Sequence, residues 1–197
     1  PGGIIAPAAT SPGEIVVNGW SPSKRNNPYA NSGIVVNVEE KDIQAFAKHG
    51  PLGAMYFQQS VEQKAFAVGG GALVAPAQRL ADFAKGIVST SLPDCSYLPG
   101  IHSANLKEVL PPFVHKALQL GFKEFGKKLR GYFTNDAVVV ATESRTSSPV
   151  RIPRDRETLQ HPQLENLYPC AEGAGYAGGI VSAAMDGERI ADKIAEG

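Results

Sequence analysis

The sequence lacks an excess of charge of either sign, because its 19 basic and 19 acidic residues cancel. Proteins dedicated to nucleic acids or anionic membranes need a basic surface, so the balance argues against both classes of partner. No apolar run approaches the roughly 18 to 20 residues that cross a bilayer, and the first residues have no signal-peptide pattern. We therefore expect a cytoplasmic protein without a membrane span.

Cysteine is scarce too. Cys95 and Cys170 are the two present, and neither belongs to a CxxC pair or a Cys/His cluster. The four histidines also lack metal-ligand spacing. We therefore expect no disulfide framework and no metal site. A redox-active Cys170, beside a glycine-rich turn, is the less favoured alternative to two ordinary thiols.

A dinucleotide-binding fingerprint, GxGxxG at the start of a βαβ unit, is also missing. The glycine clusters at 69–71 and 173–175 do not supply it. Any pyrophosphate cradle would therefore have to lie upstream. The chain opens with Pro1-Gly2-Gly3 rather than Met, and we interpret it as a fragment of a longer protein.

What is present is enough apolar sequence, 43% of 197 residues, to bury a core. Periodicity and turn residues predict a mixed α/β (α+β) fold, in which strands are interrupted by a helical insertion and followed by a C-terminal strand, turn and helix. The predicted strands are 4–8 and 14–18, which form a hairpin, then 33–38, 137–142 and 167–170. The predicted helices are 42–49, 52–68, 77–87, one from Pro111, and a last one from Ile180. Residues 91–106 have no usable pattern.

The last predicted helix is amphipathic. One apolar face recurs at steps of three and four residues. Its members are Ile180, Ala184, Gly187, Ala191 and Ile194.

The strongest chemical signal precedes that helix. Residues 168–180 contain the carboxylate of Glu172 and four glycines, at positions 173, 175, 178 and 179. Such a turn lets a ligand approach the backbone, and the amides at a helix start favour an anionic or electron-rich group. The alternative, of equal weight on pattern alone, is that the glycines allow close packing of helix on sheet and that Glu172 is a surface carboxylate.

The stretch CAEGAGYAGGIVSAAMDGERIADKI resembles the last FAD-contacting motif of large two-domain flavoproteins. The stretch ESRTSSPVRI at 143–152 is similar to a bacterial family of uncharacterised FAD-dependent dehydrogenases, among the NAD(P)/FAD-dependent oxidoreductases. Further similar segments at 30–33, 64–71 and 75–79 extend the resemblance over nearly the whole chain.

The resemblance implies a role for the glycine-rich turn. In the wider flavoprotein group an acid at the position of Glu172 bonds the ribityl chain or a nearby phosphate, and the next helix faces the flavin. The cofactor-binding residues it implies are Glu172, Gly173, Ala174, Gly178, Gly179 and Ile180. Two departures are Ala171, where glycine is common, and Glu172, where Asp is usual.

The resemblance also implies an organisation: residues 1–136 as a substrate-side or cap-like portion, and 137–197 as the C-terminal segment of an FAD-binding domain whose Rossmann-type part lies upstream. Arg145, Thr146, Ser147 and Ser148 are candidates for binding a small-molecule substrate or the flavin edge. Equally, they could form a turn that bonds its own backbone, with Arg145 in a structural salt bridge. Arg151 and Arg154 are expected to be surface charges.

We therefore predict a fragment of an FAD-dependent oxidoreductase that transfers hydride or electrons between an unknown substrate and the flavin. No catalytic residue can be assigned. The main alternative is a lid or interaction module with no cofactor of its own. A third is a small-anion binder that uses the helix start at Gly178.

Overall fold

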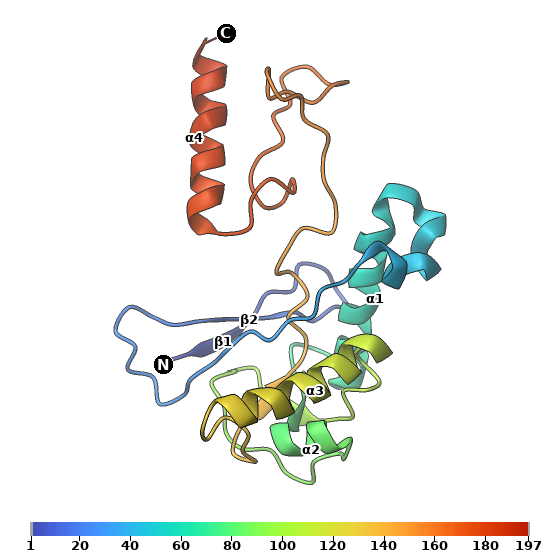
Figure 1. Cartoon of the computed structure of the whole chain (residues 1–197), viewed down its shortest axis with the longest axis vertical. Helices are drawn as coiled ribbons and strands as arrows, with labels where there is room; N and C mark the ends of the chain where they lie inside the picture. The colour runs from blue at the N-terminus through green and yellow to red at the C-terminus, as the bar shows by residue number, and fades with distance from the viewer. Residues whose placement is uncertain (1, 197) are drawn as a thin grey trace. The chain divides into compact units, whose positions relative to one another are not determined.

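The computed structural model describes residues 2–196 and combines two small sheets with helices (Figure 1). This confirms the predicted mixed α/β class. The chain divides into two compact units. The first contains the residues up to 39 together with 58–144, and the second contains 40–57 together with the residues from 145 onward.

The first sheet is a hairpin near the N-terminus. Strand β1 (Ile4–Pro7) pairs antiparallel with β2 (Val17–Trp20). The amide of Ala8 continues the ladder by donating to the carbonyl of Val16 at 2.8 Å. In the connection Gly13 has φ 76°, which glycine adopts without steric cost. The predicted hairpin is therefore confirmed, with its second strand a few residues later than expected.

The second sheet has the order β4-β3-β5. Its central strand, β3 (Ala75–Arg79), runs parallel to β4 (Ile101–Ser103) and antiparallel to β5 (Val138–Val140). The strand predicted at 137–142 is confirmed as β5. Strand β4 lies in the stretch 91–106, for which no element was predicted.

Strand β3 corrects the helix predicted over 77–87, because helix α2 spans only Leu80–Lys85. Alanine favours helix by intrinsic propensity, and the segment APAQR contains no β-branched residue. Ala75 and Ala77 are nevertheless fully buried in the central strand of the sheet. Tertiary packing between two neighbouring strands therefore overrides the local preference.

The core of the first unit includes the contact between α2 and α3 (Pro112–Lys128), which lie side by side in Figure 1. Phe83 of α2 is fully buried and meets the rings of His115 and Phe122 edge-on, at 4.9 and 5.6 Å between centroids. Burial lowers the pKa of His115, so a neutral, structural imidazole is favoured here. The helix predicted from the proline pair is confirmed.

Helix α1 spans Gly53–Val68, which confirms the helix predicted over 52–68. The helix predicted from residue 42 is present but is a 3-10 helix, η1 (Glu40–Leu52), whose backbone leaves helical geometry at Gly50. Aromatic contacts support this stretch: the ring of His49 stacks on Tyr56 with centroids 3.9 Å apart.

Two predicted strands are wrong. Among the described residues, 33–38 and 167–170 pair with no strand. The run GIVVNV has strand-forming residues, yet Val35 and Val38 are 53% and 46% exposed and no neighbouring strand is available to bond them. The expected strand, turn and helix at the C-terminal end is therefore an irregular segment, a turn and a helix.

The last helix, α4 (Ile180–Glu196), is confirmed, and its expected apolar face is largely exposed. Ile180 and Ile194 are 91% and 51% exposed, whereas Ile190 is 6% exposed. The side of α4 that contacts the preceding segment instead carries Asp186, a residue that hydropathy assigns to solvent. None of the helices among the described residues is both long and apolar enough to cross a membrane.

Candidate functional site

The turn over residues 171–176 is closed by its own backbone. The amide of Gly175 donates to the carbonyl of Glu172, and that of Tyr176 to the carbonyl of Ala171, each at 2.9 Å. Both Ala171, with φ 56°, and Gly175, with φ 82°, have left-handed backbone conformations. Glycine adopts this region freely, whereas alanine does so at a steric cost. A glycine at position 171 would adopt this conformation without that cost.

An open face remains at the tip of the turn. Glu172 and Gly173 are exposed. Within residues 2–196, the Glu172 carboxylate and the amides of both residues have no hydrogen-bond partner. A Cβ added at Gly173 would meet no atom within 4 Å. This tip can therefore accept and donate hydrogen bonds to a ligand.

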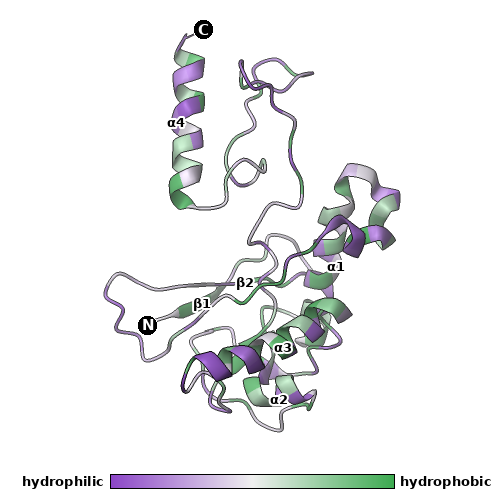
Figure 2. Ribbon diagram, viewed as in Figure 1, coloured by the Kyte–Doolittle hydropathy of each residue, from purple (hydrophilic) through white to green (hydrophobic). Residues whose placement is uncertain are grey.

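The start of α4 is partly satisfied by the chain. The Gly178 amide, expected to be bare, donates to Ser182 Oγ at 3.4 Å, and that hydroxyl donates to the Gly179 carbonyl at 2.9 Å. The amide of Ile180 has no acceptor in the described chain. The helix begins with hydrophobic residues, coloured green in Figure 2, and Ile180 and Val181 among them are exposed.

Residues 148–152 support the turn from behind. The Ile152 amide donates to the Ala174 carbonyl at 3.1 Å. The Ser148 hydroxyl lies 2.7 Å from the Val150 carbonyl and 3.3 Å from that of Gly173. A Cβ on Gly175 would lie 2.8 Å from the Val150 carbonyl oxygen, so glycine is required there. Ser148 thus connects the predicted substrate segment with the predicted cofactor turn.

The other members of the predicted substrate segment, Arg145, Thr146 and Ser147, are exposed. The Ser148 hydroxyl contacts the backbone carbonyls of Val150 and Gly173, as expected for the alternative in which this segment forms a turn rather than a ligand site. Its hydroxyl is therefore committed to the chain.

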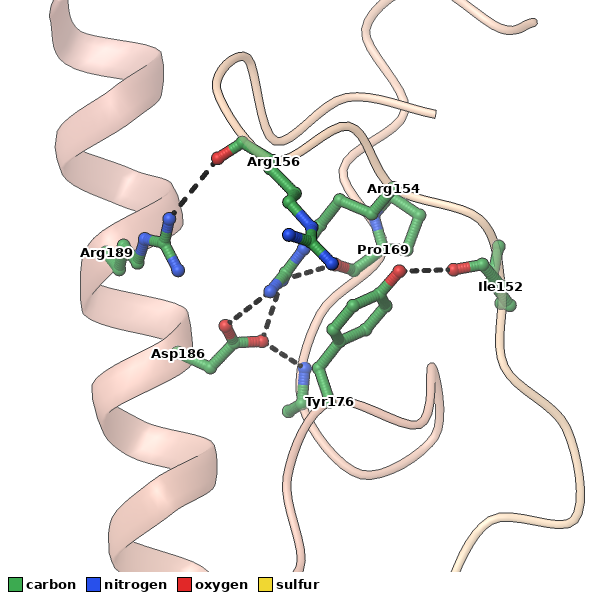
Figure 3. Close-up of polar contacts among 8 residues, drawn as sticks. Ile152, Arg154, Arg156, Pro169, Tyr176, Asp186 and Arg189 are labelled. Carbon is green, nitrogen blue, oxygen red and sulfur yellow. Dashed lines mark hydrogen bonds and ion pairs between the residues drawn. The ribbon is translucent and has the colours of Figure 1, made fainter. Parts of the chain in front are cut away.

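Arg154 is not the surface charge that the sequence predicts. Its Nη1 and Nη2 lie 2.9 and 3.0 Å from Oδ2 and Oδ1 of Asp186 on α4, and the two side chains are 7% and 10% exposed (Figure 3). Nη1 also donates to the Pro169 carbonyl at 2.9 Å. Asp186 Oδ2 in turn accepts from the Ala171 amide at 2.9 Å. The pair joins α4, the irregular segment and the glycine-rich turn.

Tyr176 completes this cluster. Its ring centroid lies 3.7 Å from Cζ of Arg154, and its hydroxyl donates to the Ile152 carbonyl at 2.9 Å (Figure 3). The exposed Arg151 approaches the same ring at 4.4 Å. Residue spacing did not predict the cluster, because Arg154, Tyr176 and Asp186 lie 10 to 32 positions apart. The one signal was an acid, Asp186, in a stretch of helix that otherwise has small and apolar residues.

The comparisons with known proteins decide the family. A family model described as "FAD-dependent protein, C-terminal domain-like" matches residues 1–146. The chain belongs to this family.

A similar protein extends the likeness beyond residue 146 to the whole chain. An uncharacterised protein of Clostridium beijerinckii is 44% identical over 198 residues, covering 100% of this chain and 36% of its own length. The chain thus spans about a third of that relative. The family model ends at residue 146 and does not include the turn at 171–176, whereas the relative does align with it.

The turn can be tested against FAD, which the description of the family names. Flavin dinucleotides present ribityl hydroxyls, which need acceptors, and ring carbonyls, which need donors. Glu172 supplies a free carboxylate, the amides of Gly173 and Ile180 supply donors, and Cβ atoms on Gly173 or Gly178 would meet nothing within 4 Å. The residues fit the hydroxyl-bearing and carbonyl-bearing part of FAD.

Cys170 does not fit a redox role. Burial first, and then the negative charge of Asp186, raise the pKa of its thiol. The thiolate is the reactive form, so this environment disfavours reactivity. Groups of three or more His, Cys, Asp or Glu side chains suited to a metal ion are absent from residues 2–196.

A surface groove of about 470 Å³ lies along the C-terminal half of α4, away from the turn. Its lining is mostly charged, including Glu157, Arg189 and Lys193, and contains none of the predicted site residues. Small-molecule sites are mainly apolar, with a few placed polar groups. The groove therefore does not mark the functional site.

Proposed function

We propose that this chain is the C-terminal part of a longer FAD-dependent oxidoreductase. In it, residues 137–197 complete the FAD-binding domain, and 1–136 form a substrate-side or cap-like portion. The family match and the share of the relative that the chain covers support a cofactor-dependent parent protein. The Rossmann-type segment that holds the pyrophosphate lies upstream, and the location is cytoplasmic.

The observation that carries the proposal is the open tip of a turn that the chain closes by itself. The Glu172 carboxylate accepts hydrogen bonds from ribityl hydroxyls. The amides of Gly173 and Ile180 donate to ring carbonyls, where the α4 dipole favours negative charge by about 0.3 to 1 kcal/mol. Ala174 seats the turn, since it is buried and its carbonyl is bonded. Gly178 and Gly179 leave room beside the helix start.

FAD, when bound, supplies the hydride or electron transfer, and the protein binds and orients it. Arg145, Thr146 and Ser147 are exposed on the segment that leads to the turn. They orient a polar substrate, while Ser148 fixes the segment to Gly173.

The rival function is a lid or interaction module without a cofactor. Exposed apolar residues on α4 favour it: Ile180, Val181 and Met185 are 91%, 72% and 64% exposed. Such residues are the usual mark of a protein contact.

Visible spectra of the complete protein separate the two functions. We expect flavin absorbance in the purified protein or after FAD is added. Glu172→Ala removes a charged acceptor, and the loss of about 1.5 to 3 kcal/mol weakens FAD binding roughly 10-fold to 150-fold. Glu165→Ala, an exposed acid in the preceding loop, is the matched control. A wild-type protein that takes up no flavin, or a Glu172→Ala protein that binds FAD as wild type does, supports the rival.

A further inference from the structure

The buried ion pair of the second unit has no part in the function proposed above. Arg154 and Asp186 make two parallel hydrogen bonds, at 2.9 and 3.0 Å, and both side chains are nine-tenths buried. A bidentate arginine fork fixes orientation as well as charge. The Arg154 fork lowers the pKa of the Asp186 carboxyl, so the acid is ionised at neutral pH.

Asp186 has a second task at the turn. Its Oδ2 accepts from the Ala171 amide at 2.9 Å. Ala171 has φ 56°, a left-handed conformation that alanine adopts only at a steric cost. Residues held in such regions persist where surrounding contacts over-determine them. The carboxylate supplies that constraint, immediately before Glu172.

Arg154 constrains the same turn from two further sides. It donates to the Pro169 carbonyl at 2.9 Å, two residues before Ala171. Its guanidinium also lies over the ring of Tyr176, at the other end of the turn. The pair thus holds the chain before, at and after the tip that carries Glu172 and Gly173 (Figure 3).

We propose that Arg154 and Asp186 are positioning residues that set the turn at 171–176 in its FAD-binding conformation before the cofactor arrives. The inference rests on the proposed function, because it names how the same site is built. Neither residue needs to touch FAD. A site whose competent conformer is only fractionally populated binds more weakly by that fraction, so loss of the clamp weakens affinity without removing a ligand contact.

The first test is a double-mutant cycle on the complete protein. Arg154→Lys keeps the charge but loses the fork, and Asp186→Asn loses the charge. We expect each to raise the Kd for FAD about 10-fold. The Kd of the double variant should be no higher than that of the single variant with the higher Kd, because the two residues act as one unit. The control is Arg189→Lys, an exposed arginine of α4 whose contact is a 3.4 Å bond to the Arg156 carbonyl. Additive losses, or losses equal to the control, overturn the proposal.

The second test asks whether the clamp acts through the backbone of Ala171. Glycine adopts positive φ without strain, so Ala171→Gly needs less holding. Added to Asp186→Asn, it is expected to recover most of the lost FAD affinity. Failure of Ala171→Gly to recover affinity contradicts the clamp.

A readout without flavin keeps the inference separable from the proposed function. We expect amide hydrogen exchange at Ala171, Gly175 and Tyr176 to become at least about 10-fold faster in Asp186→Asn, and to be unchanged in Arg189→Lys. If the wild-type protein binds no FAD while this exchange result holds, the proposed function fails and the conformational role of the pair stands. If FAD binds and exchange in Asp186→Asn equals wild type, the clamp fails and the cofactor site stands.

Discussion

The first unit and the C-terminal segment are each stabilised internally by a different kind of interaction. The first unit buries many apolar side chains, among them Phe83 of α2, Phe122 of α3 and Leu106 of the turn before α3. Across described residues 145–196, the buried apolar residues are Leu159, Ala174 and Ile190, and the ion pair of Arg154 and Asp186 does much of the joining. Apolar burial is non-directional, whereas the hydrogen bonds of an ion pair fix a geometry. The difference indicates that apolar burial mainly stabilises the first unit, whereas the ion pair mainly fixes the geometry of the C-terminal segment.

The largest expected effect lies in the apolar region. Phe83→Ala empties the contact between α2 and α3 and should lower the free energy of unfolding by about 3 to 5 kcal/mol. Leu120→Ala, at a position 57% exposed on α3, is the control and should change it little. Denaturant titration measures both. Equal losses in the two variants would break the comparison.

The ion pair should behave differently from the apolar core. Arg154→Met leaves Asp186 buried without its partner and should cost about 3 kcal/mol, while the double change Arg154→Met with Asp186→Leu should recover most of it. Limited proteolysis within 145–196 reports the change. A double variant as susceptible as the single one would show that the unpaired charge of Asp186 is not the source of the loss.

A smaller effect is expected at the glycines. Gly175→Ala places a Cβ 2.8 Å from the Val150 carbonyl oxygen at φ 82°, and should cost about 1 to 3 kcal/mol. Gly187→Ala, in α4 with nothing within 4 Å, should instead stabilise the helix by about 0.5 to 1 kcal/mol. Thermal unfolding of the two variants should move in opposite directions; a shared direction contradicts the described turn.

Acid should loosen the ion-paired segment through Asp186. Hydrogen bonds from Arg154, above all, lower the pKa of this carboxyl below its ordinary value of 3.8. A depressed pKa gives a stabilisation that is fully present above the unfolded value and is lost as the pH falls through the folded one. Amide exchange at Ala171 should therefore be insensitive to this group at neutral pH and should rise below pH 3.8, after correction for intrinsic rates. Asp186→Asn should remove that rise.

The smallest effect is expected at an exposed pair. Lys127 Nζ lies 2.6 Å from Glu124 Oε1 on α3, but the two side chains are 70% and 56% exposed. Water and salt screen such pairs. Lys127→Ala should therefore leave the unfolding midpoint unchanged within error. A loss as large as that of Arg154→Met would erase the distinction between the buried and exposed pairs.

Local patterns predicted the elements that local forces determine. The hairpin, α1, α3, β5 and α4 follow from periodicity, prolines and glycines. Strand β3 could not be predicted, because APAQR becomes a strand only between two neighbours, and the run at 33–38 failed for the opposite reason, having no neighbour.

For the candidate site, the sequence located the turn and its glycines but not what holds it. Residue spacing gave no hint that Arg154 would reach Asp186, 32 positions later, or that the acid would bond Ala171. The sequence predicted Arg154 as a surface charge and led to no prediction for Asp186. The side of α4 that contacts the segment carries this salt bridge, while Ile180 and Ile194 of the expected apolar face are exposed.

The central claim is that the tip of the turn at residues 172 and 173 contacts FAD. Hydrogen exchange on the complete protein, with and without FAD, tests it most directly. We predict that FAD slows exchange at the amides of Glu172, Gly173 and Ile180, while the amides of Gly175 and Tyr176, already bonded in the turn, change little. Bound FAD with no protection at residues 172, 173 and 180 would contradict the account.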